Sequence, residues 1–213
     1  MAILEDKIRV RFAKTGGLQY ISHLDLMRTM RTALKRARLP LKYTEGFNPH
    51  MKLNIALPLS VGAESVCEIM ELVLTEPRSD AEIVEALSGS VAPGFIIYEA
   101  YTPVHKLAEL GWAQYEIRSD EINGITAGEI IKKLKTRPMM VLKRTKSGEK
   151  DTDIAPGINR ISINSTYDLL TLVLCADGQN YLNPEYVLRF IGLEDCSIMR
   201  TKVFIGDAVT EFR

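Results

Sequence analysis

The stretch KIRVRFAKTGGLQYISHLDLMRTMRTALKRA, residues 7–37, changes its hydrophobic period around a pair of glycines. Before the glycines, basic and apolar side chains alternate over residues 7–12, as in a strand with one buried face. After them, apolar residues recur every three or four positions over residues 22–37, which predicts an amphipathic helix. Ser22 followed by Asp25 resembles the capping box that begins many helices. The stretch therefore predicts a strand, a turn and a helix that packs on the strand.

The same alternation of strand and helix patterns continues to the end of the chain and repeats once. In the first half we expect strands at 7–12, 53–59, 66–74 and 95–101 and helices at 22–37 and 79–87. In the second half we expect strands at 115–118, 139–143, 160–164, 169–175 and 197–205 and helices at 126–134 and 183–190. The polar stretch 143–151 is expected to be a mobile, exposed loop.

This element order indicates an α+β fold. We predict two tandem ferredoxin-like (β-α-β-β-α-β) domains with antiparallel sheets. The first would span residues 1–108 and the second residues 109–213, with the boundary in the polar connector 105–111. One mixed α+β sheet is the alternative.

The chain has no overall charge that would draw it to nucleic acid. Its 213 residues include 27 Lys and Arg and 27 Asp and Glu, so the formal net charge is zero. Attraction to a polyanion must therefore come from cations gathered in one region. No apolar segment reaches the roughly 20 residues of a membrane span, and the N-terminus lacks the pattern of a signal peptide. We expect a cytoplasmic protein with no membrane partner.

The cysteines and the motifs that are missing exclude several enzyme classes. Cys67, Cys175 and Cys196 lie far apart and are odd in number, which argues against a disulfide framework. They form no three-cysteine motif of the kind that binds an iron–sulfur cluster. Walker-type, G-x-G-x-x-G, H-E-x-x-H and G-x-S-x-G motifs are absent from the sequence too. The sequence therefore predicts no cofactor and assigns no reaction.

The helix at 22–37 gathers its cations on one side. Spacings of three, four and three residues place four of them in a single stripe: Arg28, Arg31, Lys35 and Arg38. One interpretation is a solvated face, and the other is a surface that neutralises phosphates. Lys7, Arg9 and Arg11 on the first strand could add a second basic row. Whether the two rows meet depends on the tertiary structure.

The segment after this helix has the composition of an ordered turn. Gly46 can adopt positive φ, and Asn48-Pro49 favours a turn or an extended backbone. Several side chains of the segment could stack on a base and hydrogen-bond to its edge: Tyr43, Phe47, Asn48, His50 and Lys52. The alternative is that Phe47 fills the core while Asn48 and His50 satisfy backbone groups.

The histidines are the weak candidates for catalysis. His23 and His50 could act as an acid–base pair, because histidine exchanges protons near neutral pH. Their spacing does not require such a pair. His23 and Asp25 are two residues apart, so their side chains diverge, whereas ligand pairs on a helix lie three or four residues apart. We expect Asp25 to cap the helix, and we expect no metal site.

The motifs G17-L18, S22-H-L-D-L-M-R28, L39-P-L41 and G46-F-N-P-H50 resemble those of the bacterial radical SAM-linked protein family, a conserved domain of unknown function. The resemblance implies a partner, a separate radical SAM protein, and an association with RNA-processing genes. It assigns motif positions to His23, Asp25, Arg28, Phe47, Asn48, Pro49 and His50. From their cap and turn chemistry we expect Ser22, Asp25, Gly46 and Pro49 to be structural.

Our leading hypothesis is an accessory protein that binds RNA, or presents an RNA-type substrate, to a separate radical SAM enzyme. Two alternatives remain. One is a metal-independent endoribonuclease, since the tandem plan is similar to that of CRISPR repeat-processing endoribonucleases. The other is a pure protein–protein adaptor, whose basic stripe would dock on an acidic surface.

Overall fold

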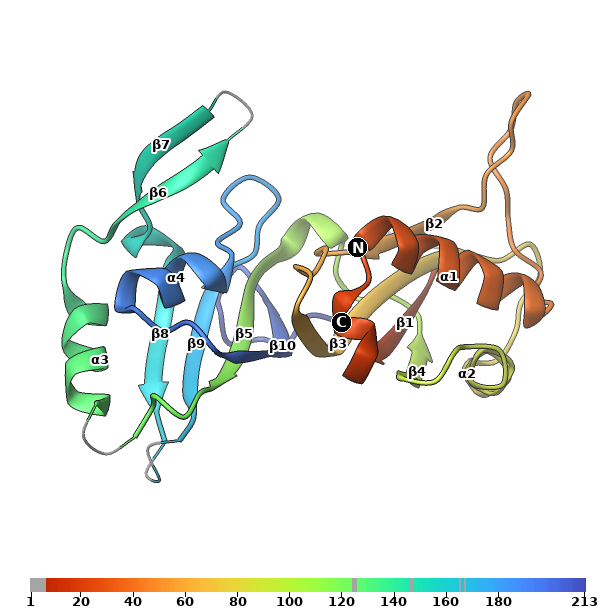
Figure 1. The fold of residues 1–213 in the computed structure, drawn as a ribbon. Coiled ribbons are helices and arrows are strands. Elements are labelled where there is room, and N and C mark those ends of the chain that lie inside the picture. The colour runs from red at the N-terminus through yellow and green to blue at the C-terminus, as the bar shows by residue number, and fades with distance from the viewer. Residues whose placement is uncertain (1–6, 124–125, 146–147, 165, 167) are drawn as a thin grey trace. The chain divides into compact units, whose positions relative to one another are not determined.

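The computed structural model describes residues 7–123, 126–145, 148–164, 166 and 168–213. It is an α+β structure whose strands pair antiparallel, which confirms the expected fold class. By its internal contacts the chain divides into two compact units, Met1–Leu107 with Arg213, and Ala108–Phe212. Figure 1 shows helices and strands in each unit. The division falls within the polar connector 105–111.

The first unit has four strands and two helices among its described residues. In chain order they are β1 (Lys7–Lys14), α1 (His23–Arg36), β2 (Leu53–Ala56), β3 (Ala63–Val73), α2 (Asp80–Ser88) and β4 (Phe95–Tyr101). The strands lie in the order β4-β1-β3-β2, and each neighbouring pair is antiparallel. A short 3-10 helix, Gly16–Tyr20, joins β1 to α1.

Both helices of this unit cover one face of its sheet. Val10 and Phe12 point to this face from β1, as their alternation predicts, and both are buried. They belong to one apolar cluster with Met30 of α1 and Leu87 of α2. The apolar stripe of α1 therefore faces the sheet, and the opposite side of the helix is left for its charged residues.

The second unit has the same order of elements, with one insertion. Its described elements are β5 (Leu110–Arg118), α3 (Ala127–Lys135), β6 (Met140–Thr145), β7 (Gly148–Asp153), β8 (Ile158–Ile163), β9 (Leu170–Cys175), α4 (Pro184–Ile191) and β10 (Ser197–Ile205). The main strands lie in the order β10-β5-β9-β8 and pair antiparallel. The inserted β6 and β7 form a separate two-stranded sheet.

The described residues of the expected loop at 143–151 belong to two paired strands, so the loop assignment is wrong, although β7 is exposed as expected. β7 pairs with β6 in continuous register from Met140 opposite Asp153 to Thr145 opposite Gly148. The carboxylate of Asp153 accepts hydrogen bonds from the N–H groups of Met139 (2.8 Å) and Ala155 (3.0 Å), which fixes the base of the hairpin. A search for alternating apolar residues does not detect polar strands, because the hydrogen bonds between strands are made by backbone groups. Residues 146 and 147 of the predicted loop lie outside the described residues.

None of the helices in the described part of the chain is both long and apolar enough to cross a membrane.

Candidate nucleic-acid interface

The start of α1 is fixed by the side chains that the sequence suggested. Ser22 is the N-cap, and its hydroxyl accepts a hydrogen bond from the N–H of Asp25. The same hydroxyl donates to the Asp25 carboxylate at 2.7 Å, and Arg28 binds that carboxylate at 3.1 Å. The hydrogen bond from Ser22, followed by that from Arg28, lowers the pKa of Asp25. Asp25 therefore serves the helix terminus, and Arg28 is already paired.

The other cations of the stripe are available to an external anion. Lys35 and Arg38 are exposed, and Arg31 is half-buried. No carboxylate among residues 7–123 and the other described ranges forms an ion pair with any of the three. Arg38 follows the C-terminal end of α1 with a left-handed backbone (φ 53°), so it lies just outside the helical repeat. The predicted stripe is therefore shorter by one residue. Arg31 and Lys35 on the helix, with Arg38 just beyond it, have no ion pair among the described residues, and Arg28 contributes less because Asp25 offsets its charge.

The suggestion that the first strand adds a second basic row is wrong. Lys7 and Arg9 both pair with Glu71, at 2.6 and 2.8 Å, and Arg9 is completely buried. Arg11 pairs with Glu99 at 2.9 Å. These pairs arise because β3 and β4 place carboxylates opposite β1, which alternation within β1 alone does not reveal. Lys7, Arg9 and Arg11 therefore pair with carboxylates of the sheet and do not form a second basic surface.

Residues 42–52 form a closed loop, here called the finger, which projects from the first unit between α1 and β2 (Figure 1). At its base the N–H of Lys52 donates to the carbonyl of Lys42 at 2.9 Å. Further out, the N–H of Thr44 donates to the carbonyl of His50 at 2.7 Å. Gly46, near the tip, has φ 117°, a conformation that favours glycine. The finger therefore has a defined backbone.

The finger displays the side chains that the sequence singled out. Phe47 is fully exposed at its tip, so the alternative that Phe47 fills the core is wrong. Tyr43 is 43% exposed, and Asn48, Pro49 and His50 are exposed as well. Within the described residues the Asn48 amide and the His50 imidazole make no hydrogen bond to the protein. Their polar groups are thus left for a ligand.

Two cations that the sequence reasoning missed extend this surface. Arg36, at the end of α1, and Lys42, at the base of the finger, are exposed. Arg36 lies beside the stripe rather than on it, and Lys42 faces Lys52 across the finger base. Counted together, residues 22–52 hold seven Lys and Arg against two Asp and Glu, a formal charge of +5 in a chain whose total is zero. Counting charge by window would have found both residues.

The structure does not bring the two candidate histidines into a pair. His23 opens α1 and His50 lies in the finger, beyond the other end of the helix. Fourteen helical residues span about 20 Å. The Nδ1 atom of His23 is buried and has no hydrogen-bond partner among the described residues. An acid–base mechanism that uses both imidazoles on one phosphate has no support in this geometry.

The fold and this surface define an α+β protein with a basic helix and an aromatic finger. Residues 7–184 match the family described as "Uncharacterized protein conserved in bacteria (DUF2344)". The chain belongs to that family.

Comparison with curated proteins gave no match. Among solved structures, a candidate glycine cleavage system transcriptional repressor is similar at 8% identity, covering 91% of this chain and 97% of the other, with a TM-score of 0.25. That score supports no inference about fold or function.

Proposed function

We propose that this protein is an accessory protein that binds RNA through α1 and the finger and presents it to a separate radical SAM enzyme. The observation that carries the proposal is the row of unpaired cations Arg31, Lys35 and Arg38, continued by the finger with exposed Phe47. Cations that alternate with exposed aromatic rings are the usual means of binding single-stranded nucleic acid.

Two magnitudes set the strength and the salt dependence expected of RNA binding at this surface. An aromatic side chain that stacks on a base contributes about 1–3 kcal/mol. Each phosphate contact releases counterions and makes binding depend on salt, with a slope of about −0.7 per contact for single strands. Phe47 and Tyr43 could supply the stacking, and the six exposed or half-buried cations of residues 31–52 could supply the phosphate contacts.

The link to a radical SAM enzyme is supported by the motif resemblance and by cysteine placement. Cys67 and Cys175 are buried, and Cys196 is partly buried. Their positions in the sequence match no cluster-binding motif. In this proposal the radical chemistry belongs to the partner chain, and this protein supplies the substrate contacts.

We also propose that each unit is a ferredoxin-like domain. The strand orders β4-β1-β3-β2 and β10-β5-β9-β8, with helices after the first and third main strands, support this assignment. The β6–β7 hairpin would then be an insertion in the second domain.

The test is RNA binding by the purified full chain, measured by fluorescence anisotropy with a labelled single-stranded 20-mer over a range of salt concentrations. We expect R31Q/K35Q/R38Q to weaken binding and to reduce the salt slope by about 2. The matched control is K132Q/K135Q/R160Q, which removes three exposed cations of the second unit. Binding that is absent at low salt, or equally affected by both triple variants, would reject the proposal.

The exposed Phe47 also favours a second function, that of a protein–protein adaptor. A single apolar side chain at the tip of a closed loop could insert into a pocket of the partner. In that case F47A should abolish co-purification with the radical SAM protein and leave RNA retention unchanged. Under the leading proposal, F47A should instead weaken RNA binding.

A further inference from the structure

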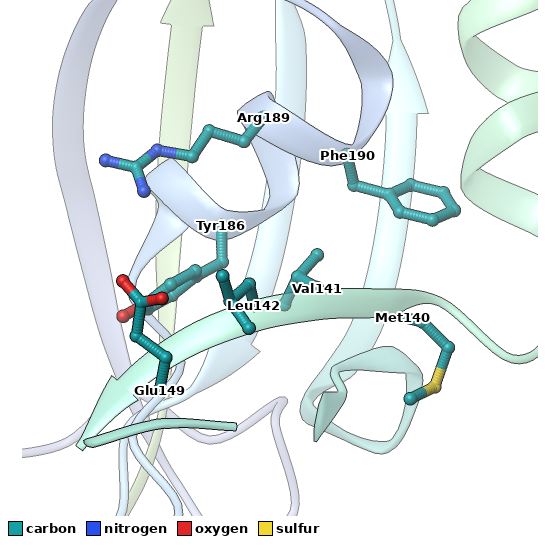
Figure 2. Close-up of a pocket in the computed structure, with 7 residues that line it drawn as sticks. All are labelled: Met140, Val141, Leu142, Glu149, Tyr186, Arg189 and Phe190. Atoms are coloured by element: carbon teal, nitrogen blue, oxygen red, sulfur yellow. The ribbon is translucent and has the colours of Figure 1, made fainter. Parts of the chain in front are cut away.

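The second unit contains an open cavity of about 750 Å³ between the β6–β7 hairpin and α4. Figure 2 shows Tyr186 and Arg189 reaching it from α4, and Glu149 reaching it from β7. Met140 and Leu142 of β6 complete one wall. Cavities of about 300–1,000 Å³ are the usual size for small-molecule sites. The cavity is therefore large enough for a compact organic ligand.

Two cations lie near the aromatic ring of Tyr186, and one of them, Arg189, lines the cavity. The Nζ atom of Lys143 is 5.3 Å from the ring centroid, and the guanidinium carbon of Arg189 is 6.0 Å from it. Arg189 follows Tyr186 by three residues on α4, so the two side chains share one helix face. No carboxylate of the described residues forms an ion pair with Lys143 or Arg189. Arg189, which lines the cavity, can therefore bind an anionic group there.

Part of the cavity wall is apolar and exposed to solvent. Met140 is 48% exposed and Leu142 is 53% exposed, although both line the cavity. Such side chains gain from contact with a flat apolar surface. Glu149 adds a carboxylate, which can accept hydrogen bonds but not donate them. A suitable ligand must therefore combine an anion, a flat apolar body and a hydrogen-bond donor.

We propose that this cavity binds a single nucleotide. Its phosphate would lie on Arg189, its base against Tyr186 and Leu142, and an N–H of the base or a ribose hydroxyl would donate to Glu149. An apolar carboxylate such as a fatty acid fits less well, because it has no donor for Glu149. The nucleotide is either free or the 5′ end of an RNA chain, since both carry a phosphate, a ribose and a base. The site does not depend on RNA binding by α1 and the finger.

The experiment is isothermal titration of the full chain with AMP, UMP, adenosine, inorganic phosphate and a 5′-phosphorylated trinucleotide. We expect AMP or UMP to bind at least about tenfold more tightly than adenosine or phosphate, since either fragment lacks half of the contacts. Tighter binding of the trinucleotide assigns the site to an RNA end. Equal or weaker binding of the trinucleotide assigns it to a free nucleotide.

Variants locate the binding in the cavity. Y186L and R189A should each weaken nucleotide binding by about tenfold or more, whereas Y186F should retain it because the ring is kept. K132A, an exposed cation on α3, is the matched control and should bind as the parent does. R31Q/K35Q/R38Q should also retain nucleotide binding, which separates this site from the RNA surface of α1. The inference is overturned if no nucleotide binds, or if R189A, whose side chain is exposed, binds as tightly as the parent.

Discussion

Thr44 and His50 hold each other by two reciprocal hydrogen bonds. The N–H of Thr44 donates to the carbonyl of His50, and the N–H of His50 donates to the Thr44 hydroxyl. The loop that displays Phe47 is thus closed by polar groups rather than by burying its aromatic side chain. A closed loop loses little conformational entropy on binding, so an aromatic at its tip is well placed to contact a ligand.

The first prediction concerns Phe47. F47A should leave the free energy of unfolding within about 0.5 kcal/mol of the parent, because the side chain is exposed. It should weaken RNA binding by about 5- to 150-fold, which corresponds to the loss of one stacked base. Chemical denaturation and anisotropy measure the two effects. V209A, an exposed apolar truncation in the second unit, should alter neither quantity.

The second prediction concerns Gly46. Its φ of 117° is one that side chains rarely adopt, and a methyl group there would meet no atom within 4 Å. G46A should therefore cost about 1–3 kcal/mol through backbone strain alone, or shift the finger and displace Phe47. Either effect should reduce RNA affinity.

Gly17 provides the matched control for this experiment. It too has open space around an added methyl group, but its φ is not positive. G17A should behave as the parent in denaturation and in RNA binding. Equal effects of G46A and G17A would show that the positive φ of Gly46 is needed neither for stability nor for RNA binding.

The sequence was sufficient for features that depend on local chemistry. The helix expected at 22–37 is observed at His23–Arg36, because its cap and its apolar stripe are encoded within the segment. Strands Phe95–Tyr101 and Ser197–Ile205 are observed with the predicted bounds.

Features that depend on distant partners could not be predicted. Arg9 became a buried, paired residue because Glu71 lies opposite it on β3, 62 positions away. Phe47 was assigned to the core as an alternative because hydrophobicity alone does not reveal a loop closed by Thr44 and His50. The cavity beside Tyr186 was missed because it requires a hairpin with no apolar alternation.

The third prediction concerns the buried pair of Arg9 and Glu71. Burial raises the pKa of Glu71, but the hydrogen bonds from Lys7 and Arg9 outweigh it and lower the pKa overall. E71L should destabilise the protein by about 3–5 kcal/mol, because Arg9 is left buried without its carboxylate. R9M/E71L should recover part of this loss in a double-mutant cycle measured by denaturation.

Glu99 is the control for the buried pair. It binds Arg11 at 2.9 Å and Arg213 at 2.6 Å, but all three side chains are partly exposed. E99Q should cost no more than about 1 kcal/mol. If E71L and E99Q destabilise equally, burial of Arg9 does not set the strength of its pair.

The fourth prediction concerns acid stability and Asp177. Its carboxylate accepts hydrogen bonds from the side chain of Asn180 and from the N–H groups of Asn180 and Gln179, which together lower its pKa to about 2. Because the folded pKa lies below the ordinary value of 3.8, the contribution to stability is complete above about pH 4 and is lost as the pH falls through about 2.

D177N should therefore remove one component of the acid sensitivity. Urea denaturation of the parent and D177N between pH 2 and pH 7 should show a stability difference that is constant above about pH 4 and shrinks below it. Asp120 is an exposed aspartate without a hydrogen bond among the described residues, so D120N should keep the pH profile of the parent. A difference between the parent and D177N that stays constant down to pH 2 would mean that the turn at Asp177 holds equally well with a protonated carboxyl group.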